Sequence, residues 1–371
     1  MGSNNNRPLK ILTWHIHSSY LYYLLQTPHE FYVPKKPGRP EAYGGLPKGP
    51  SFEWPSNAHE VPAHEVKNLD LDVILFQVKR NYIYDQFEIL SEEQRMLPRI
   101  YLEHDPPREH PTDTKHWVED PNTLIVHVTH FNKLMWDNNR SPTKVIEHGV
   151  VVPEDIRYSG ELNRGIVVVN DIAARGRRLG ADIYLHTKMH TPLDLVGIKA
   201  EDAGGLGEIK HHELPAFEAR YRYFFNPIRY TSLGLAVCEA MMVGLPIIGL
   251  ATTEMVSVIE NGYSGYLDTS IDTLIDAMKL LVAEPDEARK LSKGSRQTAL
   301  ERFNVQRFSS EWYETIQETA ANGKSQQDLP EYAVVDLLEE TFTSYSIPLT
   351  GKSTITTSEL PESEASTGES N

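Results

Sequence analysis

The residues around Gly234 have types and spacing that could bind a phosphate. An apolar segment ends at Pro227, and a polar turn then leads to Gly234 and a second apolar stretch. The pattern predicts a buried strand up to Pro227 and a helix that begins at Gly234. The first N–H groups of a helix lack partners within the helix and favour a bound anion. Because glycine has no side chain, a phosphate can approach the backbones of Gly234 and Leu235 closely.

Glu239 lies five residues further on, inside the otherwise apolar stretch LAVCEAMMV. A carboxylate in such a helix is expected to have a polar partner, because an unpaired buried charge is costly. The two hydroxyl groups of a ribose are a suitable partner. Gly234 and Glu239 together therefore indicate a nucleotide site. The neighbouring Cys238 is better interpreted as a small buried apolar residue than as a nucleophile.

This segment resembles the second domain of the glycosyl transferases group 1, family 4, which are retaining enzymes with the two-domain GT-B fold. The family pattern P-S-x-x-E-G-F-G-L-x-x-x-E-A-M-A-x-G-x-P-V-V aligns without a gap. The residues that match it, or the acidic-Gly pair that follows, are Pro227, Gly234, Leu235, Glu239, Ala240, Met241, Gly244, Pro246, Glu260, Asn261 and Gly262. Weaker similarity extends over most of residues 9–315. The resemblance implies a nucleotide-diphosphate sugar as donor, with Glu239 on its ribose.

The part of the pattern that faces the donor sugar departs from the family. The family has a first glutamate beside the donor sugar, and Thr231 stands at that position here. The glycines and glutamate of the next helix correspond to Thr253, Glu254 and Ser257. These departures indicate either an unusual donor sugar or a loss of activity, and both alternatives stay open.

Sugar transfer from a diphosphate needs cations that stabilise the charge growing on the leaving group. The family takes an Arg and a Lys from the turn that opens the second domain, where this chain has Arg175, Arg177 and Arg178. We expect Arg175 and Arg178 to bind the diphosphate, with Arg229 beside Thr231 as a replacement. The competing interpretation is that these arginines are solvated surface charges.

His104 and Asp105 follow the predicted strand RIYLE. Sites in α/β proteins gather at the carboxyl ends of strands. The resemblance implies that this turn faces donor and acceptor, so we predict catalytic roles for His104 and Asp105 together with Arg175 and Arg178. The competing interpretation is a histidine and an aspartate that only cap the turn.

The sequence contains no recognised metal-ligand motif. The histidines considered for such a site are His15, His17, His104 and His110, and their spacing matches none. The segment DLD at 70–72 resembles the metal motif of the other major glycosyltransferase fold, but it precedes the strand VILF instead of ending it. We therefore expect no metal and no cofactor.

Alternating strands and helices have to position these residues. Continuous apolar strands separated by helices predict parallel sheets covered on both faces. We predict an α/β protein of the GT-B class, with two Rossmann-like domains facing a cleft. Residues 8–155 would form the acceptor-side domain and residues 160–320 the nucleotide-sugar domain. Residues 27–57 are predicted as an ordered loop, and residues 322–371 as a mostly disordered acidic tail.

Composition limits the partners. The chain of 371 residues has 36 Lys+Arg against 52 Asp+Glu, a formal net charge of −16, which argues against a nucleic-acid partner. Its single cysteine cannot form an intramolecular disulfide or anchor a zinc cluster. No apolar run approaches the roughly 18 residues that span a bilayer, and the first residues do not resemble a signal peptide. These features predict a cytoplasmic protein without an integral membrane segment.

The predicted function is that of a retaining, metal-independent glycosyltransferase acting on an unidentified sugar, glycan or small-molecule acceptor. A non-catalytic nucleotide-sugar-binding protein is the first alternative, motivated by Thr231. A nucleotide-sugar epimerase on the same fold is the second, and it would need further carboxylates in the first domain that the sequence does not locate.

Overall fold

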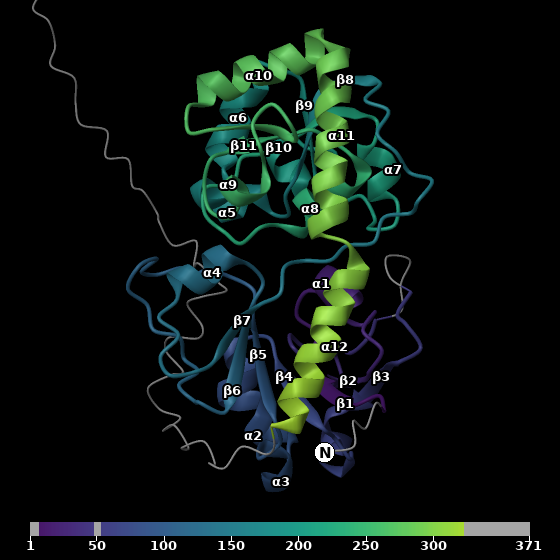
Figure 1. Ribbon diagram of the computed structural model, residues 1–371, viewed down its shortest axis with the longest axis vertical. Coiled ribbons are helices and arrows are strands. Elements are labelled where there is room, and N and C mark those ends of the chain that lie inside the picture. Colours follow the sequence, from purple (N-terminus) through teal and green to yellow (C-terminus); the bar gives the residue numbers. More distant parts are fainter. Residues whose placement is uncertain (1–6, 48–52, 323–371) are drawn as a thin grey trace, which may run out of the picture. The chain divides into compact units, whose positions relative to one another are not determined.

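The computed structural model describes residues 7–47 and 53–322, which belong to one compact unit of the chain. Two separate parallel sheets with flanking helices organise it (Figure 1). The predicted tail lies outside the described residues apart from Asn322.

The first sheet has seven strands in the order β3-β2-β1-β4-β5-β6-β7, and every pairing is parallel. The strands are β1 (Lys10–Thr13), β2 (Glu30–Lys35), β3 (Ala58–Pro62), β4 (Val73–Phe76), β5 (Arg99–Glu103), β6 (Thr123–His127) and β7 (Thr143–Val145). The order reverses between β1 and β4. Ligands of doubly wound sheets bind outside the carboxyl ends of the strands at such a reversal.

The second sheet has five strands in the order β12-β11-β10-β8-β9, again all parallel. The strands are β8 (Leu162–Val168), β9 (Leu193–Val196), β10 (Tyr221–Asn226), β11 (Ile247–Leu250) and β12 (Gly265–Asp268). Here the order reverses between β8 and β10. The segments that follow these two strands contain the predicted arginines and Gly234, so the fold gathers the predicted phosphate site at the reversal.

Helices connect the strands. The α-helices of the first part are α1 (Ser18–Leu24), α2 (Gln86–Ile89), α3 (Glu92–Arg95) and α4 (His130–Met135). Those that follow are α5 (Ile172–Arg175), α6 (Ala181–Lys188), α7 (Leu214–Glu218), α8 (Leu235–Val243), α9 (Met255–Val258), α10 (Ile271–Ala283), α11 (Pro285–Arg302) and α12 (Val305–Ala321). The short helices η1 (Ala63–Asn68), η3 (Gly176–Leu179) and η4 (Ala200–Ala203) are 3₁₀, and η2 (Asn81–Asp85) is a π-helix.

The last helix packs on the first sheet's side of the molecule. In α12, the Trp312 indole donates to the Tyr20 hydroxyl at 3.3 Å, and the Tyr313 ring stacks on His29. Figure 1 shows α12 beside the strands of the first sheet. The sequence places residues 305–320 in the second domain, whereas buried side chains of α12 complete the core around α1. The domain boundaries themselves stay a prediction.

The expected loop over residues 27–57 contains a strand, and that part of the prediction is wrong. β2 pairs with β1 through residues 30–32 and with β3 through residues 31–35. Pro34 lies beyond the part of β2 that β1 pairs with, so its missing N–H interrupts nothing on that side. The Pro and Gly content of the segment hid this short strand.

Candidate active site

The turn between β10 and α8 is built as the sequence predicts. β10 ends at Asn226, and α8 begins at Leu235 with Gly234 as its N-cap and no side chain capping it. A side chain built on Gly234 would meet nothing within 4 Å. Its φ is −73°, so glycine provides open space here and not an unusual backbone conformation. The start of α8 is therefore accessible to an anion.

Glu239 is buried on α8 and contacts a first-domain helix. Its Oε1 accepts a hydrogen bond of 2.6 Å from the Tyr23 hydroxyl of α1 and lies 3.1 Å from Nε2 of His211. Burial and the nearby Glu239 charge raise the pKa of Tyr23 well above its usual value, so the hydroxyl stays a donor. The carboxylate thus has polar partners within the protein that the sequence did not predict, and its predicted role toward a ribose stays a prediction.

A second carboxyl, Glu218, lies at the end of α7. It is fully buried, and neither of its oxygens has a hydrogen-bond partner in the described part of the chain. Burial, and secondarily the charge of Glu239, raises the pKa of Glu218 well above its usual value. Burial therefore disfavours a second negative charge, at Glu218, beside that of Glu239.

Arg175 and Arg178 follow β8, at the end of α5 and within η3. Among the residues that the structure describes, neither guanidinium has a hydrogen bond or an ion pair. Partial burial lowers the pKa of both. Arg175 and Arg177 are both exposed, but Arg177 differs in that its guanidinium pairs with Asp182 at 2.6 Å. Arg177 is thus already engaged within the protein, whereas the guanidinium groups of Arg175 and Arg178 are available to a ligand, and their contact with a diphosphate stays a prediction.

Arg229 is engaged within the protein. Its guanidinium bonds both oxygens of Asp182, at 2.6 and 2.7 Å, and the carbonyl of Arg177 at 2.6 Å. The backbone N–H of Arg229 donates to the carbonyl of Arg178 at 3.0 Å. Arg229 therefore fixes the turn that presents Arg178, and any direct contact with a diphosphate would compete with Asp182. Thr231 beside it is partly exposed, and its predicted contact with the donor stays a prediction.

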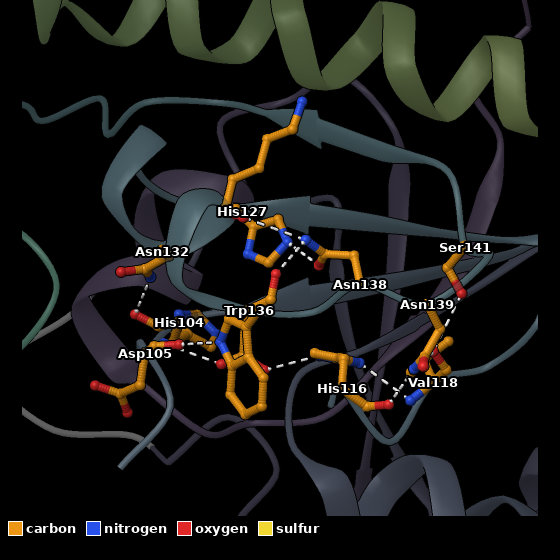
Figure 2. Close-up of polar contacts among 12 residues, drawn as sticks. His104, Asp105, His116, Val118, His127, Asn132, Trp136, Asn138, Asn139 and Ser141 are labelled. Atoms are coloured by element: carbon orange, nitrogen blue, oxygen red, sulfur yellow. Dashed lines mark hydrogen bonds and ion pairs between the residues drawn. The ribbon is translucent and has the colours of Figure 1, made fainter. Parts of the chain in front are cut away.

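His104 and Asp105 form a turn held mainly through its backbone. Figure 2 shows the Asn132 side chain donating to the carbonyl of His104 at 3.1 Å and the Trp136 indole donating to the carbonyl of Asp105 at 2.8 Å. The His104 ring lies 3.1 Å from Oε1 of Gln77. Burial lowers the pKa of His104 well below its usual value, so the imidazole is neutral. The Asp105 carboxylate pairs with Arg108 at 2.6 Å.

Hydrogen bonds join this first-domain turn to the turn before α8. The Tyr230 hydroxyl donates to the carbonyl of Pro107 at 2.8 Å, and the Asn132 amide donates to the Ser232 hydroxyl at 3.3 Å. The backbone N–H of Tyr230 reaches the carbonyl of Arg178 at 3.3 Å. Tyr230 thereby links the segment of Arg108 to that of Arg178.

Three arginines from the two domains consequently lie within electrostatic reach of one another. The charges of Arg108 and Arg175 lower the pKa of Arg178 further, and Asp105 opposes them. Two carboxylates, Asp105 and Asp171, act on these three guanidinium groups, which leaves local positive charge in a chain whose formal net charge is −16. Such a cluster attracts an anion with several negative charges.

Several of the residues considered for a metal, namely His15, His104, Asp70 and Asp72, have other contacts. The two ring nitrogens of His15 lie 2.6 Å from the carbonyl of Gly45 and 2.8 Å from the Ser18 hydroxyl. Asp70 and Asp72 form ion pairs at the opposite, amino end of β4. Within residues 7–47 and 53–322, no group of three or more His, Cys, Asp or Glu side chains is arranged to hold a metal ion.

Two surface hollows lie away from this site. One of about 300 Å³ is bounded by Tyr158 and α11, and one of about 550 Å³ lies at the amino end of β4. Glu239 lines neither of them, and its Oε1 is bonded by Tyr23 of the first domain. In the ranges that the structure describes, no helix has the length and apolar character required to cross a membrane.

Comparisons with known proteins agree with the geometry. Residues 201–298 match the family model described as Glycosyl transferases group 1. The structure of sucrose-phosphate synthase from Thermosynechococcus elongatus is similar to this chain, with a TM-score of 0.61 and 14% identity over 85% of this chain and 100% of that one. The fold is GT-B. No curated protein matches the chain.

Two further GT-B structures are similar. One is HepE from Anabaena in complex with UDP and glucose, with a TM-score of 0.58 and 15% identity over 83% of this chain and 99% of that one. The other is AviGT4, a glycosyltransferase involved in avilamycin A biosynthesis, with a TM-score of 0.55 and 13% identity over 86% and 100%. The predicted GT-B fold is confirmed, and the group 1 match supports the predicted glycosyltransferase.

Sequence reasoning did not identify several residues of this site. Tyr23, His211 and Arg108 contact or influence the predicted residues, yet none was predicted for the site. Tyr23 belongs to the aromatic segment SSYLYYLL, which indicates a helix but does not distinguish one tyrosine from the next. The partner predicted for Glu239 is a ribose, and only the fold reveals that Tyr23 and His211 also contact this carboxylate.

Proposed function

We propose that this chain is a retaining, metal-independent glycosyltransferase of family 4 that moves a sugar from a nucleotide-diphosphate sugar to an acceptor. One observation carries the proposal: Arg175 and Arg178 have no partner among the described residues and follow β8, the strand beside β10 at the reversal of the second sheet. The open start of α8 follows β10. Two available guanidinium groups and free helix amides match the chemistry of a diphosphate.

The donor would be held by the second domain. The diphosphate would lie against Gly234 and Leu235, with Arg175 and Arg178 stabilising its growing charge. Glu239 would accept hydrogen bonds from the ribose. Because Thr231 is smaller than the glutamate that the family has at this position, it would leave more room beside the donor sugar. Because HepE has been crystallised with UDP and with UDP-glucose, uridine-diphosphate sugars are the first donors to test.

The acceptor would approach from the turn at His104 and Asp105. In the proposed step, the bond between the anomeric carbon and the diphosphate oxygen breaks while the acceptor oxygen bonds to the same face of that carbon. The acceptor's proton passes to the departing phosphate oxygen, so no separate general base is needed. His104, neutral because of its burial, would orient the acceptor by hydrogen bonding and would not supply charge.

A non-catalytic nucleotide-sugar-binding protein is the second candidate. It is favoured by Thr231, which lacks a carboxylate, and by the engagement of Glu239 with Tyr23 and His211. Both candidates require the diphosphate site, and only the first requires turnover.

A thermal-shift screen with UDP, GDP, ADP, CDP and their sugars tests the shared requirement, because a ligand of the folded state raises the melting temperature. The donor so identified is then incubated with a panel of sugar and small-molecule acceptors, and glycosylated product is measured by mass spectrometry. Stabilisation with product supports the transferase. Stabilisation with neither product nor free sugar supports the binding protein, and no stabilisation by any of these nucleotides contradicts both.

A further inference from the structure

A buried hydrogen bond crosses between the domains at the residue assigned to the ribose. The Tyr23 hydroxyl of α1 donates to Oε1 of Glu239 on α8 at 2.6 Å. The length is typical of a hydrogen bond to an ionised carboxylate, which is stronger than a neutral one. The first domain therefore contacts the carboxylate that the proposed function gives to the nucleotide.

The two oxygens of Glu239 are used unequally. Oε1 has both Tyr23 and His211 as partners, at 2.6 and 3.1 Å. His211 also lies 3.2 Å from the Tyr23 hydroxyl, so the three groups hold one another. In the described part of the chain, Oε2 has no hydrogen-bond partner, and it is not among the unpartnered atoms that are fully shielded from solvent.

The surroundings keep this arrangement fixed. The Glu239 side chain is only 7% exposed, so few rotamers are available to it. The raised pKa of Tyr23 keeps its proton on the phenol, so Tyr23 can only donate to the carboxylate. With Oε1 held, the orientation of Oε2 is determined.

Two other bonds between the domains end on backbone carbonyls, while the bond between the Asn132 and Ser232 side chains is longer, at 3.3 Å. The Tyr230 hydroxyl donates to the carbonyl of Pro107, and the His148 ring lies 2.8 Å from the carbonyl of Leu233. The carbonyls of Pro107 and Leu233 are backbone atoms, which suits a purely structural contact. Tyr23 instead bonds a side chain with a further accepting oxygen, which suits a role toward a ligand.

We propose that Tyr23 is a positioning residue. Together with His211 it holds Oε1 of Glu239 and presents Oε2 to the ribose hydroxyls, so that the first domain takes part in recognising the nucleotide of the second. This inference rests on the proposed function, because it assigns Glu239 to the ribose.

The test measures the dissociation constants of a ribonucleotide and of its 2′,3′-dideoxy analogue by isothermal titration calorimetry. UDP is used, or GDP, ADP or CDP if the thermal-shift screen selects one of these. The proteins are the full chain, Tyr23→Phe, Glu239→Gln and Tyr158→Phe. Tyr158 is the matched control, since its hydroxyl donates to the carbonyl of Arg222, a second-domain backbone group.

We expect Tyr23→Phe to weaken ribonucleotide binding about tenfold, as for the loss of a hydrogen bond to a charged group. Binding of the dideoxy analogue should be nearly unchanged, and Tyr158→Phe should alter neither. Equal weakening for both nucleotides would make Tyr23 merely structural and overturn the inference. Tighter ribonucleotide binding by Tyr23→Phe would show that Tyr23 competes with the ribose for Glu239. An unchanged ribonucleotide affinity would show that Tyr23 does not affect nucleotide binding. Either result also overturns it.

Glu239→Gln separates this inference from the proposed function. If that variant still distinguishes the ribonucleotide from its dideoxy analogue, the ribose assignment itself fails. If Glu239→Gln loses the distinction while Tyr23→Phe retains it, the proposed function stands and the positioning role fails.

Discussion

The two turns that face each other across the domains differ in how many of their polar groups are already bonded within the protein. On the second-domain side, which comprises the segments after β8 and β10, Arg175 and Arg178 have no partner among the described residues. The space in front of Gly234 is open. At the first-domain turn, the carbonyls of His104 and Asp105 are bonded by Asn132 and Trp136. The second-domain side therefore presents unpaired positive charge to a ligand, while the first-domain turn presents a backbone held in one conformation. Preorganised charge stabilises a leaving diphosphate, and a fixed backbone orients an acceptor.

The largest expected effect comes from removing the available charge. The double substitution Arg175→Ala and Arg178→Ala should lower kcat by about 10²–10³-fold, as for the loss of groups that stabilise a transition state. Arg177→Ala is the matched control, because Arg177 lies in the same turn but its guanidinium is already paired with Asp182. Steady-state kinetics with the donor found by the screen measures both. Equal losses in the two proteins would mean that the turn itself matters and not its free guanidinium groups.

A fall in pH should destabilise the first domain more than the second. Burial lowers the pKa of His29, His127 and His148 to about 4 and that of His116 to about 3. These histidines bind fewer protons folded than unfolded, so stability present above pH 6.5, their ordinary pKa, is lost as pH falls toward 4. Each contributes a slope of up to about 1.4 kcal/mol per pH unit. Glu103 acts oppositely, because burial raises its pKa to about 8 and stability falls as pH rises toward that value.

Hydrogen exchange at pH 6.5 and pH 5, corrected for intrinsic rates, checks this expectation. The first sheet should lose more protection than the second, since all four histidines precede residue 150. His127→Gln should flatten the dependence of unfolding free energy on pH measured in urea. Equal loss of protection in both sheets would be inconsistent with the assignment.

Loosening the fixed turn should have a smaller effect. Trp136→Phe removes the indole N–H bonded to Asp105 and should cost about 1 kcal/mol of stability. It should lower kcat/KM roughly fivefold through displacement of the acceptor turn, with diphosphate affinity unchanged. Trp117→Phe is the control, because its indole N–H has no partner in the described part of the chain. A loss confined to diphosphate affinity would reverse the roles given to the two turns.

The smallest effect is expected at Gly234. Gly234→Ala places a methyl group in the open space before α8 and should weaken diphosphate binding by roughly two- to fivefold. The fold should lose less than about 1 kcal/mol, since the φ of −73° suits alanine. Calorimetry with the selected nucleoside diphosphate and urea unfolding give the two values. Unchanged binding would place the diphosphate away from the start of α8.

The features that sequence could predict are local in the chain. Pro227, Gly234 and Glu239 lie within one strand–turn–helix unit, so their spacing alone indicates the site. Tyr23 and Glu239 are 216 positions apart, and no local pattern links them. The same limit explains α12, whose apolar face indicates a helix but not which sheet it covers. The strand at residues 30–35 was missed because its proline and flanking glycines are typical of a loop.

Glu254 connects the two turns in a way that depends on the domains staying together. Its Oε2 accepts the backbone N–H of Phe131, in the first turn of α4, at 2.7 Å. The same short helix supplies Asn132, and Trp136 follows it directly. Parting the domains would leave that amide without its acceptor and weaken the support beneath His104 and Asp105. The acceptor-side turn is thus held rigid in part by a second-domain residue, and it should become more mobile when the domains separate.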